Sequence, residues 1–223
     1  MNGRELPLET ADGLRDRLLA GAAAMGVDLS VQSAARLLDY LRLLDKWNAK
    51  FNLSAVGGLG EMLGRHLLDS LSIAPWINGG EVVDAGSGAG LPGIPLAVLY
   101  PEKRFALVDS NGKKTRFLFQ AKTELGLANV EVAQCRIEQY RGPADLVVCR
   151  ALAGLEETAA KTRHLLSSGA MLVAMRGRHP GAEELSRLPQ DCAVAFVNPL
   201  QVPGGGSRHV VGIRHRGPEA ERT

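Results

Sequence analysis

A glycine-rich turn between residues 82 and 93 constrains the fold of this chain more than any other feature. The stretch reads V-V-D-A-G-S-G-A-G-L-P-G, so closely spaced glycines and a proline follow a short apolar run. Glycine tolerates positive φ angles and lets a ligand approach the backbone, while proline suits the first turn of a helix. The first amides of a helix lack partners inside it, and they favour an anionic ligand group. The stretch therefore predicts a buried strand, a ligand-binding turn and a helix.

Apolar spacing on either side of the turn predicts the rest of the architecture. Up to residue 77, apolar residues recur at helical intervals in three stretches, 14–25, 34–47 and 59–71. Beyond them, short β-rich runs alternate with helical stretches, which is typical of a parallel sheet with helices on both faces. The expected strands are 81–84, 104–109, 129–134, 144–149, 170–175, 193–202 and 207–214, and the expected helices are 92–99, 113–125 and 155–166.

The last two expected strands form a unit of their own. Three consecutive glycines at 204–206 lie between them, a pattern that favours an antiparallel hairpin. We therefore expect a doubly wound α/β fold: a mostly parallel, Rossmann-like sheet of seven strands that ends in an antiparallel hairpin, with an N-terminal helical extension. The expected division is a helical subdomain at 1–77, a ligand-binding core at 78–216 and a flexible polar tail at 217–223.

Composition bounds the class of protein. Hydrophobic residues make up 45% of the 223 positions and charged residues 22%, which is ordinary for a globular chain. Three cysteines without a close pair argue against a disulfide framework and against a metal site. The sequence has no apolar leader and no run long enough for a membrane span, so we expect a cytoplasmic protein without a membrane partner. A net charge of +2 means that any nucleic-acid footprint must be local.

Two carboxylates indicate which ligand the turn binds. The pattern is D-x-G-x-G-x-G, with Leu91 where the dinucleotide fingerprint has its third glycine. A carboxylate at Asp84 would repel a pyrophosphate but attract the α-ammonium group of a methionine. Asp109, at the end of the next strand, is placed to accept both hydroxyls of a ribose. The pattern favours S-adenosylmethionine, while NAD and a turn that binds nothing stay alternatives. The residues assigned to this cofactor are Asp84, Gly86, Gly88 and Asp109.

Eight stretches beyond residue 40 carry a family resemblance. They are W-N-A-K-F-N-L-S-A (47–55), R-H-L-L-D-S-L (65–71), D-A-G-S-G-A-G-L-P-G-I-P-L-A (84–97), L-V-D-S-N-G-K-K-T-R-F-L (107–118), R-I-E (136–138), C-R-A-L-A (149–153), A-M-R-G (174–177) and R-H-V-V (208–211). In these the chain resembles the bacterial 16S ribosomal RNA guanine-N7 methyltransferases, also called the glucose-inhibited division protein B family. The resemblance implies a class I methyltransferase that uses S-adenosylmethionine. Its partner would be 16S rRNA or the small ribosomal subunit, and it would act as a monomer with no role for DNA.

The resemblance also implies roles for single residues. Those implied at the cofactor are Gly86 and Leu91 along the site, Ile137 and Glu138 beside the adenine, and Arg150 at the pocket mouth. The implied catalytic residues are Asn52, His66, Arg136 and Arg150, and the implied RNA contacts are Lys113, Lys114, Arg136 and Arg176. The family has a lysine where this chain has Arg176, so a planar guanidinium replaces a compact ammonium group.

Several of these residues also have a plainer structural explanation. His66 would serve equally as a core or capping histidine, and the charges from Lys113 to Arg116 as a solvated helix face. Arg150 follows a buried strand, so it needs either an acid or a ligand carboxylate as its partner. Other basic residues would extend an RNA-binding patch if the fold gathers them, namely Lys46, Lys50, Arg65, Arg178 and Arg208.

The implied reaction needs little acid–base chemistry. Guanine N7 has a lone pair and no proton, so its methylation requires no general base. The chain has no N-P-P-Y-like or cysteine-pair motif of the kind used on exocyclic amines or pyrimidine carbons. We therefore expect catalysis by proximity and orientation, with Asn52 and the basic residues positioning the RNA. A methyltransferase of another RNA, a protein or a small molecule stays an alternative, as does a non-catalytic RNA-binding module.

Overall fold

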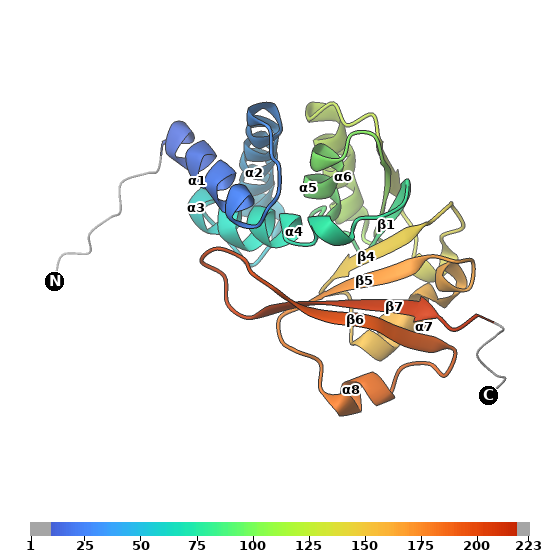
Figure 1. The fold of residues 1–223 in the computed structure, drawn as a ribbon. Coiled ribbons are helices and arrows are strands. Elements are labelled where there is room, and N and C mark those ends of the chain that lie inside the picture. The colour runs from blue at the N-terminus through green and yellow to red at the C-terminus, as the bar shows by residue number, and fades with distance from the viewer. Residues whose placement is uncertain (1–9, 218–223) are drawn as a thin grey trace.

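A computed structural model describes residues 10–217, and its fold is a seven-stranded sheet with helices on both faces (Figure 1). The predicted tail at 217–223 lies outside the described residues except for Gly217. The strands are β1 (Glu81–Ala85), β2 (Arg104–Val108), β3 (Val130–Ala133), β4 (Leu146–Arg150), β5 (Met171–Arg176), β6 (Cys192–Leu200) and β7 (Arg208–His215).

The order of the strands across the sheet is β3-β2-β1-β4-β5-β7-β6. β1 pairs in parallel with β2 and with β4, and the parallel pairing continues outward to β3 and β5. β7 runs antiparallel to both β5 and β6. The predicted sheet, mostly parallel and ending in an antiparallel hairpin, is confirmed.

The chain reverses its path across the sheet at β1. From β1 it winds outward through β2 and β3, and it then crosses back to β4 on the other side of β1. The connections that leave β1 and β4 therefore diverge, and this divergence opens a crevice at the carboxyl ends of the two strands. The glycine turn directly follows β1, and Arg150 is the last residue of β4, so both lie at this crevice.

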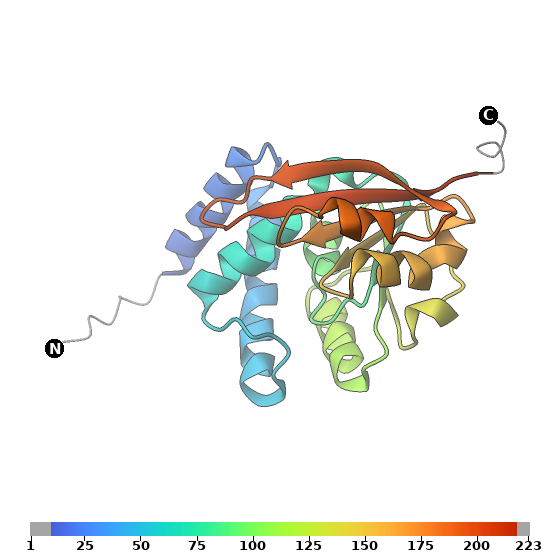
Figure 2. The same ribbon diagram turned by 90° about the horizontal axis from the view of Figure 1, so that it is seen from below.

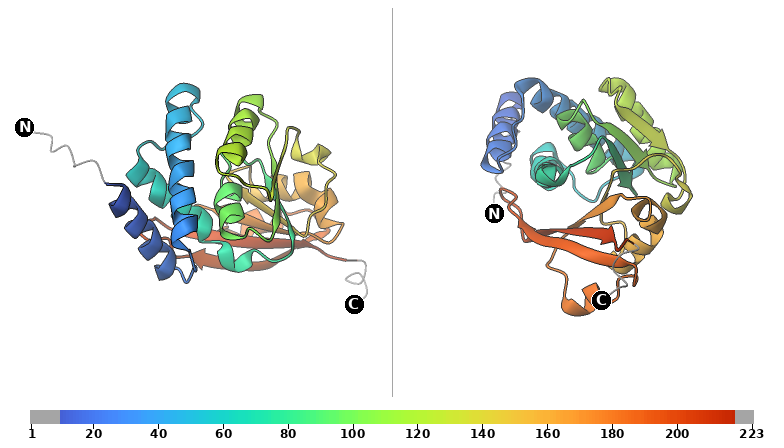
Figure 3. Two further views of the ribbon diagram at one scale, coloured as in Figure 1. Left: turned by 90° about the horizontal axis from the view of Figure 1, so that it is seen from above. Right: turned by 45° about the vertical axis from the view of Figure 1, so that its right-hand side comes forward.

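Helices cover the two faces of the sheet unequally. Side chains of α1, α2, α5 and α6 belong to one hydrophobic cluster with the sheet, while α7 packs in a second cluster on the opposite face. α7 packs against β7 of the hairpin and α8 packs against α7 (Figure 2), and Figure 3 shows α2 standing next to α6. No helix within residues 10–217 combines the length and the apolar character that a membrane crossing requires. The helices are α1 (Ala11–Ala24), α2 (Val31–Phe51), α3 (Leu59–Met62), α4 (Asp69–Leu71), α5 (Gly93–Leu99), α6 (Gly112–Glu124), α7 (Leu155–Leu166) and α8 (Ala182–Ser186), and the short turns are η1 (Leu63–Leu68), η2 (Ala74–Trp76) and η3 (Ile137–Gln139).

The N-terminal helices share their core with the sheet. Ser30 caps α2 by accepting a hydrogen bond from the Ser33 amide at 3.0 Å, which satisfies one of the amides left free at a helix start. One hydrophobic cluster then joins Leu41 of α2 to Leu107 of β2 and Phe117 of α6. The division at residue 77 stays a prediction, but the apolar packing is continuous across it.

The third predicted helix, 59–71, is helical throughout but not regular. It is built from α3, the π-helical turn η1 and α4 in succession. Among the apolar residues that recur at helical intervals along it, Leu63, Leu67 and Leu71 are buried, while Leu59 is half-buried. Single π-helical turns inside α-helices are frequent at functional sites, and this one contains His66.

Candidate active site

The glycine turn needs glycine for two separate reasons. Gly88 has a φ of +59°, and its amide donates to Asp109 Oδ2 at 2.9 Å, so a residue with a side chain would be strained there. Gly93 lies against the sheet, where an added Cβ would come within 2.3 Å of the Leu107 side chain and 2.6 Å of Asp84 Oδ2. The turn is therefore fixed to the ends of both β1 and β2.

Asp84 lies underneath this turn. Its side chain is 0% exposed, and Oδ2 accepts a hydrogen bond from the Gly93 amide at 2.9 Å. Burial raises the pKa of Asp84 to about 7, although the Gly93 hydrogen bond works in the opposite direction. Within residues 10–217 its other oxygen, Oδ1, has no hydrogen-bond partner. The carboxyl group thus holds the turn in shape, and its contact with a ligand ammonium group stays a prediction.

Asp109, unlike the fully buried Asp84, lines a cleft. Its Oδ1 accepts from the Asn111 amide at 2.8 Å, Oδ2 accepts from the Gly88 amide, and Lys114 Nζ lies 3.8 Å from Oδ2. An ionised carboxylate has about four acceptor positions. Two of them are used by backbone amides, so the remaining ones are free to accept the hydroxyls of a sugar.

The cleft beside Asp109, called here the glycine-turn cleft, has a volume of about 430 Å³. It gathers predicted residues from three stretches of the chain: Gly86, then Asp109 and Lys114, then Arg136, Ile137 and Glu138. Ala151 and Lys161 also line it, and sequence reasoning singled out neither. The predicted residues Gly88 and Leu91 lie in the turn without lining the cleft, and Leu91 is buried. The fold therefore brings together Asp109 and the Gly86 backbone, which the turn pattern predicted, with Ile137 and Glu138, which the resemblance implied.

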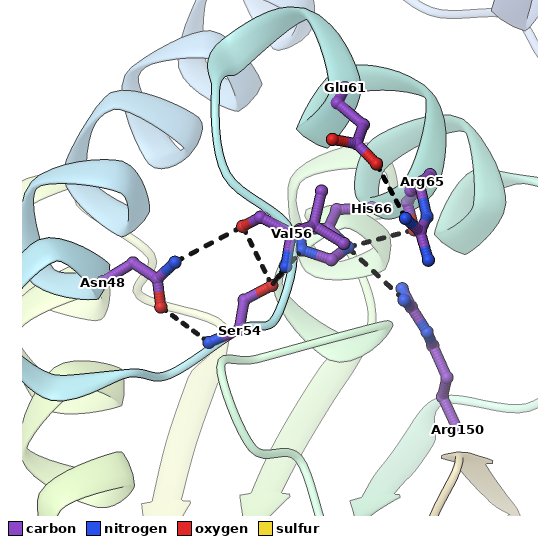
Figure 4. Close-up of polar contacts among 7 residues, drawn as sticks. All are labelled: Asn48, Ser54, Val56, Glu61, Arg65, His66 and Arg150. Atoms are coloured by element: carbon purple, nitrogen blue, oxygen red, sulfur yellow. Dashed lines mark hydrogen bonds and ion pairs between the residues drawn. The ribbon is translucent and has the colours of Figure 1, made fainter.

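His66 is held in a polar network at the π-helical turn (Figure 4). The ring is 3% exposed; Nε2 lies 2.7 Å from Ser54 Oγ, and Nδ1 lies 3.0 Å from the Arg65 carbonyl oxygen. Asn48 fixes Ser54 in turn, because its Oδ1 accepts from the Ser54 amide at 2.7 Å. Burial, and secondarily the Arg150 guanidinium, lower the pKa of His66. The imidazole is therefore neutral, and both of its nitrogens have protein partners.

Arg150 connects this network to the sheet. Its Nη2 lies 3.3 Å from His66 Nδ1, and its Nη1 lies 3.3 Å from Asp69 Oδ2. Asp69 is 4% exposed, and its Oδ1 accepts a hydrogen bond from Arg208 Nε at 2.9 Å. Of the two partners that the sequence allowed for Arg150, an acid or a ligand carboxylate, the structure shows an acid, Asp69, which also binds Arg208.

A second cleft, called here the arginine cleft, has a volume of about 490 Å³. It adjoins the glycine-turn cleft at Ala151, which lines both and has a left-handed φ of +52°. Such backbone conformations are uncommon for residues other than glycine and cluster at functional sites. The charged residues that line the arginine cleft are Asp69, Arg150, Arg176, Arg178 and Arg208.

Arg176 uses its guanidinium group in two directions. Nη1 donates to the Ala153 carbonyl at 3.1 Å, and Nη2 pairs with Glu184 Oε1 at 2.5 Å. Glu184 Oε2 lies 3.1 Å from Arg178 Nη2, so one acid pairs with both arginines. A lysine, with a single nitrogen, would not bridge the Ala153 carbonyl and Glu184 in this fork-like way.

Other predicted residues lie outside both clefts. Asn52 is exposed at the end of α2 with a left-handed φ of +50°, and Lys113 is exposed in the first turn of α6. Of the additional basic residues, Arg178 and Arg208 join the arginine cleft, whereas Lys46, Lys50 and Arg65 do not line it. Sequence reasoning missed Asp69 as a partner of Arg150. The available signal was its spacing of three residues from His66 on one helix.

Comparisons with known proteins bear on this site. The sequence profile of the family described as rRNA small subunit methyltransferase G matches residues 33–211. A ribosomal RNA small subunit methyltransferase G from Ectopseudomonas mendocina (strain ymp) is 49% identical over 204 residues, covering 89% of this chain and 95% of the relative. A protein of the same name from Pseudomonas aeruginosa (strain LESB58) is 51% identical over 203 residues, covering 89% and 94%.

Solved structures resemble the fold at much lower identity. Magnesium protoporphyrin IX methyltransferase from Synechocystis PCC 6803, a crystal structure with bound S-adenosylmethionine, has a TM-score of 0.55 and 18% identity. The match covers 79% of this chain and 97% of that one. The M1A22 tRNA methyltransferase of B. subtilis has a TM-score of 0.54 and 18% identity, covering 66% and 65%. At such identities the likeness concerns the fold alone.

Proposed function

This chain belongs to the rRNA small subunit methyltransferase G family, and from that premise we propose that it methylates N7 of a guanine in 16S ribosomal RNA, with S-adenosylmethionine as the methyl donor. The observation that carries the proposal is that two clefts of different chemistry adjoin at one edge of the sheet. One presents a glycine turn and a carboxylate, the other presents four guanidinium groups, and Ala151 lines both. A nucleoside cofactor and an anionic RNA would therefore meet at Ala151.

S-adenosylmethionine fits the groups that the glycine-turn cleft presents. Asp109 keeps acceptor positions for the ribose hydroxyls after its two bonds to backbone amides. Ile137 and Glu138 would flank the adenine, and the backbone at Gly86 would lie beside the methionine part. When bound, the cofactor would supply its methyl group to the lone pair of guanine N7: the carbon–nitrogen bond forms as the carbon–sulfur bond breaks, and S-adenosylhomocysteine is the leaving group.

Residues behind the cleft wall support this site. Asp84, Gly88 and Leu91 shape the turn from within, because Asp84 binds the Gly93 amide and Gly88 binds Asp109. A turn whose shape is set before the ligand arrives loses less conformational freedom on binding. The same fixed geometry would set the direction from which the methyl group is presented to the base.

The proposed reaction requires no proton acceptor, because guanine N7 carries a lone pair and no proton. His66 is neutral, but Ser54 and the Arg65 carbonyl occupy its two nitrogens. Asp69 would hold Arg150 at the rim of the arginine cleft, beside the neutral ring of His66. Catalysis would then rest on orienting the guanine ring. Arg136, which lines the glycine-turn cleft, and Asn52, which lies outside both clefts, would help to place the RNA.

The RNA backbone would be held by the local cluster of basic residues rather than by the net charge of the protein, which is only +2. Arg176, Arg178 and Arg208 line the arginine cleft, and Lys114 and Arg136 line the neighbouring one. Lys113 is exposed next to Lys114 and would extend the same track. One guanidinium group can donate two parallel hydrogen bonds to the oxygens of one phosphate, so the arginine cleft would hold the RNA backbone more strongly than the glycine-turn cleft.

The substrate also indicates where the enzyme would act and with which partner. An enzyme that modifies ribosomal RNA acts where ribosomes are, so we place this protein in the cytoplasm. Its partner would be 16S rRNA or the small ribosomal subunit, and it would act as a monomer. Neither DNA nor a membrane has a role in this proposal.

The decisive experiment is methyl transfer from labelled S-adenosylmethionine to small ribosomal subunits, and separately to naked 16S rRNA, from a strain that lacks this gene. The expected result is one labelled guanine, with the methyl group on N7. Label in protein or in small molecules, with none in rRNA, would overturn the proposed substrate and favour the alternative acceptors.

A pair of carboxylate variants tests the cofactor half of the proposal. Asp109→Asn weakens the proposed ribose contact, so binding of S-adenosylhomocysteine should weaken about tenfold or more. Asp145 also accepts two backbone amides, those of Gly80 and Glu81 at 2.8 and 3.0 Å, but it lies at the opposite end of the strands. Asp145→Asn should therefore bind normally, and an equal loss in both variants would refute the assignment of Asp109.

A further inference from the structure

Tyr40 reaches the glycine turn from the N-terminal helices. It lies in the middle of α2, its side chain is 0% exposed, and its hydroxyl donates a hydrogen bond to the Ala89 carbonyl at 2.7 Å. Ala89 is part of the turn that follows β1, 49 residues further along the chain. A buried phenol in α2 thus binds the backbone of the proposed cofactor site directly.

The Ala89 carbonyl needs an outside donor because of the way α5 begins. The Leu91 amide donates to the Ser87 carbonyl four residues earlier, at 3.0 Å, and the same α-helical pattern would join the Gly93 amide to the Ala89 carbonyl. Here the Gly93 amide donates to Asp84 Oδ2 instead, and regular bonding resumes only with the Ile94 amide donating to Gly90 at 2.8 Å. In the described part of the chain, Tyr40 is the donor that completes the Ala89 carbonyl. Asp84 therefore accepts from the Gly93 amide, and Tyr40 donates to the Ala89 carbonyl, in place of the bond that this pattern would form between Gly93 and Ala89.

This bond is close to the groups that face the glycine-turn cleft. Ala89 follows Gly88 directly, and the Gly88 amide is the donor to Asp109 Oδ2. A rotation of the peptide units around Ala89 would therefore redirect the Gly88 amide and release the Asp109 carboxylate. The chain of contacts runs from Tyr40 through the turn to the carboxylate proposed to hold the ribose.

The ring of Tyr40 is itself fixed. Its centroid lies 6.3 Å from that of Phe117, which is fully buried in α6, and α2 packs against both α5 and α6. Burial raises the pKa of Tyr40 far above its usual range, so the hydroxyl stays protonated and available as a donor.

We propose that Tyr40 is a positioning residue for S-adenosylmethionine: its hydroxyl holds the Ala89 carbonyl, and through it the Gly88 amide and Asp109, in the geometry that binds the cofactor. The inference deepens the proposed function and rests on it. It gives α2 a role in cofactor affinity, in addition to its role in the N-terminal core.

The test is Tyr40→Phe, which keeps the ring and removes only the donor. Without this donor the buried Ala89 carbonyl is removed from water and has no hydrogen bond to compensate, which destabilises the turn that it belongs to. We expect S-adenosylhomocysteine, measured by calorimetry, to bind roughly tenfold more weakly, which corresponds to about 1.4 kcal/mol. The KM for S-adenosylmethionine should rise by a similar factor, whereas kcat at saturating cofactor should stay within about twofold, because the bound geometry can still form.

Tyr100→Phe is the matched control. Tyr100 also donates its hydroxyl to a backbone carbonyl, that of Ala74, at 3.0 Å, but it follows the far end of α5. This variant should bind the cofactor product like the wild type. If Tyr40→Phe lowers only the melting temperature and leaves binding and KM unchanged, Tyr40 is merely structural and the inference is wrong.

Hydrogen exchange separates this inference from the proposed function. In Tyr40→Phe the amides of residues 86–90 should exchange faster than in Tyr100→Phe, with or without any ligand. Absence of S-adenosylhomocysteine binding by the wild-type protein would refute the proposed function. Unchanged exchange at 86–90 would refute the anchoring of the turn by Tyr40, whatever the wild type binds.

Discussion

Removal of the Asp69 carboxylate should loosen two arginines at once. Asp69 accepts a hydrogen bond from Arg208 Nε at 2.9 Å and lies 3.3 Å from Arg150 Nη1, and its side chain is only 6% exposed. In Asp69→Asn the shape is kept, but both guanidinium groups lose their negative partner. The expected consequence is a less stable protein in which the arginine cleft is less well ordered.

The magnitude follows from the burial of the partners. Breaking a fully buried pair from one side destabilises a protein by about 3–5 kcal/mol. The side chains of Arg150 and Arg208 are 24% and 29% exposed, so water recovers part of this loss. We expect Asp69→Asn to lower the free energy of unfolding by about 2 kcal/mol, a hydrogen bond to a charged group being worth about 1.5–3 kcal/mol. For a domain of this size that lowers the melting temperature by roughly 4–8 °C.

A double-mutant cycle isolates the interaction. Unfolding in urea is followed for Asp69→Asn, Arg208→Met and the double variant, and the coupling energy between Asp69 and Arg208 should be about 1–2 kcal/mol. The surface pair Glu61–Arg65, whose side chains are 54% and 57% exposed, is the control, with about 0.3–0.5 kcal/mol expected. A coupling for Asp69–Arg208 no larger than that of the surface pair would refute the assignment of Asp69 as the anchor.

Three further predictions concern single features. Burial raises the pKa of Asp84 to about 7, whereas an aspartate in the unfolded chain has a pKa near 4. Between these two values the folded protein holds a proton that the unfolded chain has released. The contribution of Asp84 to the free energy of unfolding is therefore complete below about pH 4 and is lost as the pH rises through about 7. The pH dependence of the melting temperature should therefore flatten in that window in Asp84→Asn, and an unchanged slope would contradict the raised pKa. Replacing Arg176 and Arg178 together by alanine should weaken rRNA binding. The slope of log K against log salt concentration, measured by filter binding, should become less steep by about one to two. An unaltered slope would exclude both arginines from phosphate contact. Gly93→Ala should lower the free energy of unfolding by about 1–3 kcal/mol, since the new Cβ would meet Leu107 and Asp84, whereas Gly181→Ala meets nothing within 4 Å; equal thermal shifts would argue against the tight packing at Gly93.

Local pattern predicted most of the secondary structure because apolar periodicity and glycine positions act over short distances. The predicted strand 104–109 is β2 and the predicted helix 155–166 is α7, with bounds that agree to within a residue. The sequence missed α8, which buries none of its side chains and therefore has no apolar stripe to reveal it. It also predicted a plain helix where the π-helical turn η1 occurs, because a wider turn leaves almost the same apolar spacing.

The glycine turn and Asp109 could be predicted because a strand, a turn and the next strand of a parallel sheet form one local unit. Ile137 and Glu138 could be assigned only by resemblance, since nothing in their own sequence indicates a nucleoside. The fold then brings both of these groups to a single cleft.

By itself, the sequence determined the succession of strands and helices along the chain, the antiparallel hairpin and the position of the ligand-binding turn. The tertiary structure alone decided which polar groups meet across long separations: Arg208 and Asp69 at 139 residues, Arg150 and His66 at 84, and Tyr40 and Ala89 at 49. Hydrogen bonds and ion pairs of this kind depend on angles and distances of a few ångströms between packed elements. Spacing along the chain does not encode such distances, so these contacts exist only once α2 and the π-helical turn have packed against the carboxyl edge of the sheet.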